Sequence, residues 1–303
     1  FKNGLWHGQG EWHASNGDVY RGGFEQGLFS GQGSLTTHDS TYVGGFKQGR
    51  REGEGTRKEA GLSYRGEFKD DQFSGNGQLE LEDGSQYKGQ FARGKPHGEG
   101  MRSDASGNEF TGQFVNGELE GNGVFNSADG DQYEGAFKHN QLNGKGRYEN
   151  ADGDVWVGEF KDGALTGKGE LIGIDGSHYR GMFNEWRFNG PGHLSMPDAS
   201  TYVGEFAADT YQGQGTLTLA DGSVQSGFWL NGQRVRDANG TVLPDPLELG
   251  LLNQGTLLSE ALAGIAPSTP AIELYSLVLA GDGKQSVFKR EADYVSNMLA
   301  SRF

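Results

Sequence analysis

The chain of 303 residues contains no cysteine and only seven prolines. Without cysteine, these residues hold no disulfide, no thiolate metal ligand and no thiol nucleophile. Proline is scarce and glycine does not recur at every third position, which excludes a collagen-like triple helix. No apolar run approaches the ~20 residues that a membrane-spanning helix needs.

Basic residues are also few. The 26 Lys and Arg face 41 Asp and Glu, so the formal net charge is −15. This charge opposes binding of nucleic acid by the chain as a whole. The seven histidines show no metal-ligand spacing such as HExxH, and no GxSxG elbow is present. We therefore expect no cofactor, no metal site, no catalytic residue and no nucleic-acid partner in these residues.

Glycine is abundant, at 54 of 303 residues, and it recurs with a fixed period. Each unit begins with an aromatic-x-Gly-x-Phe segment, whose first residue is Tyr20, Tyr42, Tyr64, Tyr87, Phe110, Tyr133, Trp156, Tyr179 or Tyr202. Successive segments are 22 or 23 residues apart, and Gly-x-Gly pairs such as Gly31 and Gly33 keep the same period. Two markers locked to one period establish a repeat protein of about ten units.

Each unit has the pattern of a β-hairpin. The aromatic residue, Gly and Phe alternate, so they share one face of a strand and are expected to form the core. A Gly three residues after the Phe predicts a tight turn, and Asn-Gly or Asp-Gly pairs predict the turn that closes the unit. The Gly-x-Gly pair leaves room for the aromatic rings of a neighbouring unit. Trp186 stands where the turn Gly is expected and predicts a different turn geometry there.

The segment from Tyr87 to Gly100, YKGQFARGKPHGEG, resembles the MORN repeat. The resemblance covers residues 1 to about 232 and implies an extended, twisted antiparallel sheet. MORN arrays serve as scaffolds, dimerisation modules or docking modules, and lipid binding has been proposed for the family. The resemblance therefore implies a protein or peptide partner or a homo-oligomer, with a membrane lipid as the alternative.

The composition changes after about residue 243. Residues 247–263 are leucine-rich and predict one or two short helices, suited to covering the open edge of the last hairpin. After a Pro-Ser-Thr-Pro linker, residues 272–279 are continuously apolar and predict a buried strand. A Gly-Asp-Gly turn and a helical apolar pattern follow. We expect the first βα unit of an incomplete α/β domain, because one such unit cannot bury both faces.

Residues 272–303 resemble the opening of bacterial legumain-type cysteine peptidases, which have a caspase-like fold. The matching features include the strand that ends in Ala280-Gly281-Asp282-Gly283 and the closing Arg302-Phe303. Bacterial members of that family often carry MORN repeats before the peptidase domain. The resemblance implies a catalytic His and Cys on later strands, outside this chain, and a place in the bacterial cell envelope or periplasm, with the cytoplasm as the alternative.

Two surfaces are candidate binding sites. The second residue after the turn Gly is mostly apolar and recurs once per unit, either as packing between hairpin tips or as an exposed rail for a partner. The candidate partner-binding rail comprises Trp6, Phe29, Phe73, Leu119, Leu142, Leu165, Phe188 and Tyr211. A locally basic segment offers a phosphoinositide site, although a solvated hairpin is the simpler interpretation. This candidate basic patch comprises Lys47, Arg50, Arg51, Arg57, Lys58 and Arg65.

The sequence thus predicts three parts: a mainly β MORN array of about ten stacked hairpins (1–236), a capping and linker segment (237–271) and a truncated caspase-like unit (272–303). The leading functional prediction is a docking, oligomerisation or substrate-presenting arm of a legumain-type cysteine peptidase. The alternative is a non-catalytic MORN scaffold that docks on a partner or a membrane.

Overall fold

The computed structural model describes residues 1–263. The chain divides into two compact units, Phe1–Leu243 and Pro244–Phe303, which we describe separately. The first unit is the repeat array. The predicted strand and helix in residues 272–303, and the part boundary at residues 271 and 272, lie outside the described residues.

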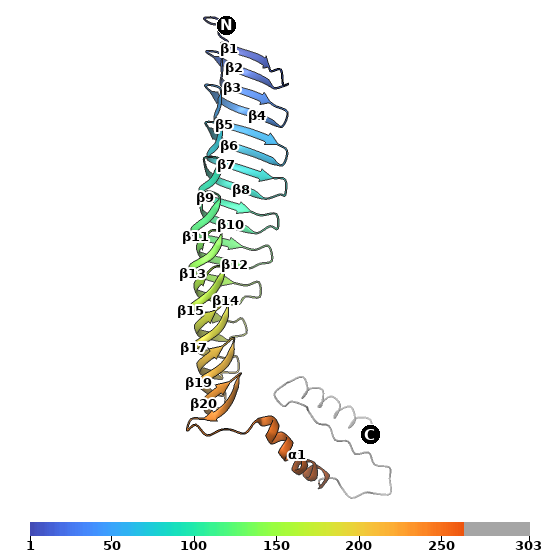
Figure 1. Ribbon diagram of the computed structural model, residues 1–303, viewed down its shortest axis with the longest axis vertical. Helices are drawn as coiled ribbons and strands as arrows, with labels where there is room; N and C mark the ends of the chain where they lie inside the picture. The colour runs from blue at the N-terminus through green and yellow to red at the C-terminus, as the bar shows by residue number, and fades with distance from the viewer. Residues whose placement is uncertain (264–303) are drawn as a thin grey trace, which may run out of the picture. The chain divides into compact units, whose positions relative to one another are not determined.

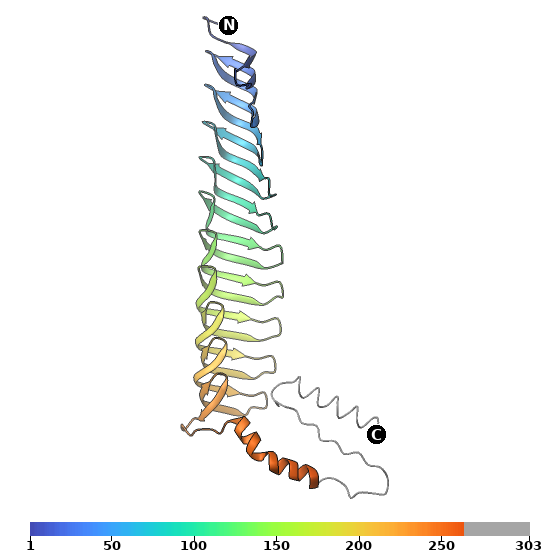
Figure 2. The ribbon, with the colours of Figure 1, turned by 45° about the vertical axis from the view of Figure 1, so that its right-hand side comes forward.

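The array is one open sheet of 21 strands, in which each strand pairs antiparallel with the next strand of the chain (Figure 1). The first strands are β1 (Gly8–His13), β2 (Val19–Glu25), β3 (Leu28–Thr36), β4 (Ser40–Lys47), β5 (Arg50–Glu59), β6 (Leu62–Lys69) and β7 (Gln72–Leu81). The middle strands are β8 (Gln86–Ala92), β9 (Lys95–Ser103), β10 (Glu109–Val115), β11 (Glu118–Asn126), β12 (Gln132–Lys138), β13 (Gln141–Glu149) and β14 (Val155–Lys161). The last strands are β15 (Ala164–Ile172), β16 (His178–Asn184), β17 (Arg187–Ser195), β18 (Thr201–Ala207), β19 (Thr210–Thr218), β20 (Val224–Leu230) and β21 (Gln233–Asp237). The predicted stack of about ten β-hairpins is confirmed, and Figure 2 shows its gradual twist.

The turn that follows each Phe, which we call the tip turn, has two successive residues with positive φ. Gln26 and Gly27, for example, have φ of 52° and 82°, as a type I′ turn requires. The prediction for Trp186 is wrong: Glu185 and Trp186 have φ of 48° and 72° and make the same turn. The Trp186 ring packs 5.0 Å from Tyr148 and 5.5 Å from Phe160 between ring centroids, which offsets the backbone strain of a bulky residue at positive φ.

The Gly-x-Gly pair has two separate structural roles. The first glycine, such as Gly31 with φ of 72°, lies in a bulge where three residues of β3 oppose one residue of β2. The second glycine lies beneath a ring: a Cβ added to Gly33 would be 2.4 Å from the Tyr20 hydroxyl. The covering ring therefore comes from the same unit, and the prediction of a neighbouring unit's ring is wrong for most units.

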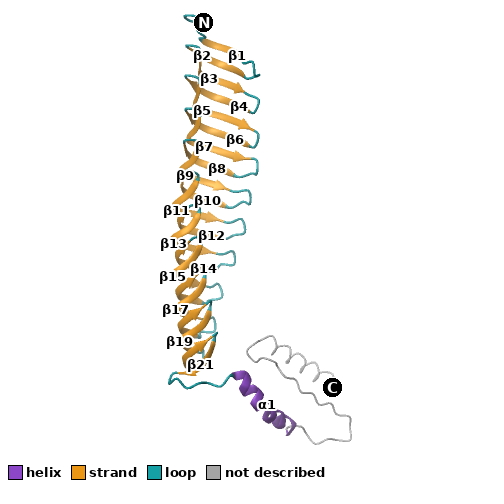
Figure 3. Ribbon diagram, in the orientation of Figure 1, coloured by secondary structure: helices purple, strands orange, loops and turns teal. Residues whose placement is uncertain are grey.

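The first unit ends in a short segment that follows β21. Leu243 donates a backbone hydrogen bond to Val235, and Arg236 forms an isolated bridge with Val242, so residues 237–243 fold back along the last strand. In the described part of the second unit, residues 244–263, the chain forms the helix α1 (Pro246–Ala263) (Figure 3). It confirms a helix at the predicted position, as a single element rather than two. Whether it covers the edge of the sheet stays a prediction.

Candidate interaction surfaces

One face of the array, which we call the inner face, carries a ladder of buried aromatic residues. Tyr20, Tyr64, Tyr133, Tyr179 and Tyr202 have no exposed surface. The tyrosine hydroxyl donates to the carbonyl three residues on, as Tyr20 does to Gly23 at 2.9 Å. Burial is the main cause that raises the pKa of Tyr133 and of Tyr179 to about 12. The prediction that these aromatic residues form the core is confirmed.

The predicted rail residues pack onto this ladder. Phe29 stacks on Tyr20, Phe73 on Tyr64, Phe188 on Tyr179 and Tyr211 on Tyr202, with ring centroids 3.7 to 3.8 Å apart. Leu142 is half-buried, and Leu119 and Leu165 have no exposed surface. Trp6 remains 37% exposed beside Phe24. The geometry is that of packing, and a role of these residues in partner binding stays a prediction.

The two fully buried leucines mark an exception in the ladder. Leu119 and Leu165 belong to the units in which Phe110 and Trp156 replace the ladder tyrosine. A Cβ added to Gly112 or Gly158 would meet these leucines at 3.0 and 2.8 Å. The leucine thus occupies the space over the glycines, and the Phe110 and Trp156 rings are half-buried.

A second row on the inner face was missed by sequence reasoning. Each member lies on the returning strand, directly opposite a ladder residue of the next unit, as Leu35 lies opposite Tyr42, except that Leu217 lies opposite Gln225. This return-strand row comprises Trp12, Leu35, Arg57, Leu79, Arg102, Phe125, Tyr148, Leu171, Leu194 and Leu217. All ten side chains are half-buried. The detectable signal was that apolar residues recur at the second position after each Gly-x-Gly pair.

The predicted basic patch is dispersed over the unit that carries it. Arg57 lies on the inner face opposite Tyr64, whereas Arg65 lies opposite Thr56 on the other face. Lys47 pairs with Arg50 at a tip turn. Arg50 and Arg51 form ion pairs with Asp70 and Asp71 at 2.8 and 3.0 Å. These six cations, Lys58 included, do not converge on one anion site, and their role in lipid binding stays a prediction.

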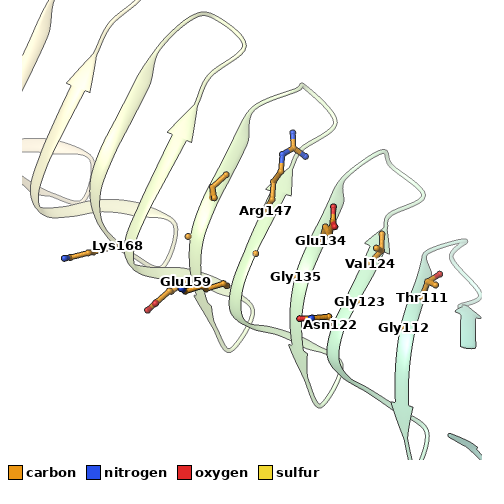
Figure 4. Close-up of a pocket in the computed structure, with 14 residues that line it drawn as sticks. Thr111, Gly112, Asn122, Gly123, Val124, Glu134, Gly135, Arg147, Glu159 and Lys168 are labelled. Atoms are coloured by element: carbon orange, nitrogen blue, oxygen red, sulfur yellow. The ribbon is translucent and has the colours of Figure 1, made fainter. Parts of the chain in front are cut away.

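The outer face, opposite the aromatic ladder, holds an open hollow of about 860 Å³. Its floor is the paired glycines Gly112, Gly123, Gly135, Gly146 and Gly158. Figure 4 shows that the strands bend here, and that Glu134 and Arg147 lie along one side while Glu159 and Lys168 lie along the other. The lining charges are of both signs, so the hollow has no preference for one sign of ligand charge.

Among the described residues, one cluster has the composition of a metal site. His139 Nδ1 lies 2.8 Å from Glu118 and 3.1 Å from Glu120. The histidine and Glu118 are exposed, and hydrogen bonds account for the arrangement, from His139 Nδ1 to Glu118 and from the His139 backbone N–H to Glu120. Within residues 1–263, no helix is both long and apolar enough to cross a membrane.

The fold defines a class of protein: a repeat scaffold built of stacked hairpins. The MORN repeat model matches residues 1–19, 20–41, 42–58, 64–86, 87–109, 110–132, 133–155, 156–178 and 202–224. The chain therefore belongs to the MORN-repeat family. Residues 179–201, which hold Trp186, are not among the matched segments, yet they form the same hairpin.

No curated protein matches the chain. Among solved structures, the TCP10 domain of Danio rerio CPAP is 10% identical over 78% of this chain and 98% of that chain, with a TM-score of 0.26. The SAS-4 TCP domain of Drosophila melanogaster, in complex with a proline-rich motif of Ana2, is 8% identical over 73% of this chain and 90% of that chain, with a TM-score of 0.23. Likenesses with TM-scores this low do not establish a shared fold or function.

Proposed function

We propose that the array is a docking arm that binds a protein partner along its inner face. The observation that carries this proposal is the return-strand row, a continuous series of half-buried, mostly apolar side chains on a single-layer sheet. No second layer covers this row within residues 1–243. Each member keeps a part of its surface exposed, and partly exposed apolar side chains that line up in one row are suited to contact with a protein partner.

The size of the row suits such an interface. From β1 to β19 the row crosses 18 strand spacings of ~4.8 Å, or roughly 85 Å. An extended or helical segment laid along a part of this length buries the ~800 Å² per partner that a stable complex needs. Docking on an anionic membrane is less favourable, because residues 1–242 carry 22 basic and 34 acidic residues, 22 − 34 = −12.

Site-specific photocrosslinking tests the proposal. A photoreactive amino acid replaces Leu79 or Leu171 on the inner face, and the matched controls replace Thr111 or Val157 on the outer face. We expect one protein to crosslink at the inner positions in the native host, and the purified partner to crosslink at the same positions. Equal crosslinking on both faces, or none on the inner face, would contradict the proposal.

A narrower proposal places this arm in a legumain-type cysteine peptidase. Its support is the sequence resemblance of residues 272–303 alone. Intact mass and peptide mapping of the protein from its native source test it, since a peptidase must continue into strands that carry His and Cys. Loss of proteolysis in a Cys→Ala variant would support the proposal, and a native chain without such strands would refute it.

A further inference from the structure

Arg102 is one of two charged members of the return-strand row, and unlike the other, Arg57, it forms none of the ion pairs among residues 1–263. Its guanidinium lies 4.6 Å above the Phe110 ring and 5.8 Å from the Phe114 ring. The side chain is half-buried, and burial lowers the pKa of Arg102 below its ordinary value. Within residues 1–263 this guanidinium takes part in none of the ion pairs, and the charge of Asp104 acts on it without an ion-pair contact.

The carboxylate that acts on Arg102 already accepts hydrogen bonds from other residues. Asp104, two residues along the strand, accepts hydrogen bonds at Oδ1 from the backbone of Ser106 and Asn108. Its Oδ2 accepts a hydrogen bond from Asn108 Nδ2. These bonds hold the closing turn, so Asp104 cannot turn toward Arg102 without breaking them.

Arg57 provides the comparison inside the same row. It occupies the equivalent position two units earlier, and Glu59, again two residues along, pairs with it at 2.5 Å. The chain therefore gives one arginine of the row a carboxylate in direct contact and leaves the other with a carboxylate that acts on it only from a distance. A buried or half-buried guanidinium favours a bidentate carboxylate partner, because the planar fork matches the two oxygens.

The unit around Arg102 is also arranged differently from its neighbours. Leu119 takes the place over Gly112 that a ladder tyrosine takes in most units, and Phe110 packs 4.9 Å from Phe125. The Phe110 ring is thereby available to Arg102, and the two form a planar, partly exposed cationic surface. In the next unit, by contrast, Tyr133 lies over Gly146.

We propose that Arg102 and Phe110 recognise a single carboxylate on an otherwise uncharged polyproline II segment of the docking partner, laid along the return-strand row. Leu79 and Phe125 are the neighbouring row members, each two strands from Arg102, or about 9.6 Å away. A segment in polyproline II conformation covers this distance in three residues, about 9.3 Å, and returns every third side chain to the same side. The site thus fits a peptide with Asp or Glu at its centre and apolar residues three positions before and after it.

Fluorescence polarisation with synthetic peptides on the full-length protein tests this inference, which rests on the proposed docking function. The probe is a labelled 12-residue peptide that contains Leu-x-x-Glu-x-x-Leu, and its control has Gln in place of Glu. We expect Arg102→Leu to weaken binding of the Glu peptide at least tenfold and Arg102→Lys to weaken it less. Arg57→Leu should change it less than twofold. Leucine occupies this row at Leu35 and Leu79, so both Leu variants should keep the thermal unfolding midpoint within a few degrees.

Several outcomes would overturn the inference. They are equal affinity for the Glu and Gln peptides, no binding of either peptide, and equal losses in the two Leu variants. Inorganic phosphate or phosphatidylserine vesicles are the alternative anions. If either binds with the same dependence on Arg102, the ligand of this site is that anion and not a peptide carboxylate. If a partner crosslinks at Leu171 and its affinity is unchanged by Arg102→Leu, the docking function stands and this inference alone fails.

Discussion

Few residues can replace the paired glycines of this array, because a side chain covers them, a tyrosine ring in most units and Leu119 or Leu165 in two. A Cβ added to Gly146 would lie 2.3 to 2.5 Å from three atoms of the Tyr133 side chain. In the Trp156 unit, a Cβ added to Gly169 would lie 3.1 Å from the nearest ring atoms, which belong to Phe183 of the next unit. The same position of the repeat therefore accepts a Cβ more easily in one unit than in another.

We expect Gly146→Ala to destabilise the array by about 1–3 kcal/mol, as overpacking of a core does. Gly169→Ala is the matched control and should cost clearly less, because its neighbours need to move only by a few tenths of an ångström. Urea unfolding of the two variants and the parent measures the difference. An equal loss in both variants would show that strand conformation, rather than the covering ring, selects glycine here.

The buried tyrosines also predict how stability depends on pH. Tyr42, Tyr87, Tyr133, Tyr179 and Tyr202 have a folded-state pKa of about 12, against about 10 in an unfolded chain. Between these values the unfolded state releases protons that the folded state retains, so the free energy of unfolding falls as pH rises. Below pH ~10 the contribution is complete.

The thermal unfolding midpoint should therefore stay level up to pH ~10 and fall steeply between pH 10 and 12. Tyrosine absorbance at 295 nm, followed in the same samples, should show most ladder tyrosines ionising together with unfolding. Ionisation of these tyrosines near pH 10 in a chain that remains folded would contradict the burial of their hydroxyls.

At the scale of elements, the tip turns connect one hairpin to the next. The second turn residue donates a backbone hydrogen bond to the preceding tip, as Gly49 does to Phe29 and Trp186 to Leu165. Asn140 and Asp209 add a side-chain acceptor for the backbone of Leu119 and Phe188. The turn is held by these contacts as well as by glycine, which is why Asp, Asn and even Trp are accommodated there.

The variant Trp186→Gly separates packing from backbone strain, because glycine relieves the positive φ while removing the ring contacts. Loss of a large half-buried ring costs about 3 kcal/mol, and relief of strain returns about 1 kcal/mol, so we expect a net loss of about 2 kcal/mol by urea unfolding. Asp209→Gly, the control with no ring, should change stability by less than about 1 kcal/mol. A more stable Trp186→Gly variant would refute the packing argument.

The sequence predicted the elements well and the inner surface less well. Period and turn chemistry were enough for the hairpins and their register, since Tyr-x-Gly-x-Phe can bury its rings in only one way. The exchange of Leu119 for a ladder tyrosine over Gly112 was not predictable, because it depends on which side chain reaches the glycine first. The return-strand row was equally hidden, since half-burial of Leu35 or Arg102 follows from cross-strand neighbours that a linear pattern does not display.

At the scale of the whole array, every strand contacts mainly its two neighbours in sequence, so length should be adjustable by whole units. We expect deletion of residues 133–155, one 23-residue unit, to leave a folded array. Because these 303 residues contain no cysteine, spin labels can be placed at Lys88→Cys and Val203→Cys, ten strands apart on one face. Their separation should fall from about 48 to about 38 Å.

Deletion of residues 133–144, about half a unit, is the control for that experiment. It removes an odd number of strands and brings incompatible faces together, so the label distances should broaden and the β-sheet signal should weaken. Two folded proteins with equally sharp distances would show that neighbouring units are not locked in register.

The consecutive antiparallel pairing has a mechanical consequence. The strands lie across the array, so their hydrogen bonds point along its length and bear a stretching load one after another rather than all at once. Tension applied to the two ends should open the weakest strand pair first and lengthen the protein in steps of one hairpin at low force. Such an arm holds a shape against thermal motion, yet it extends when it is pulled.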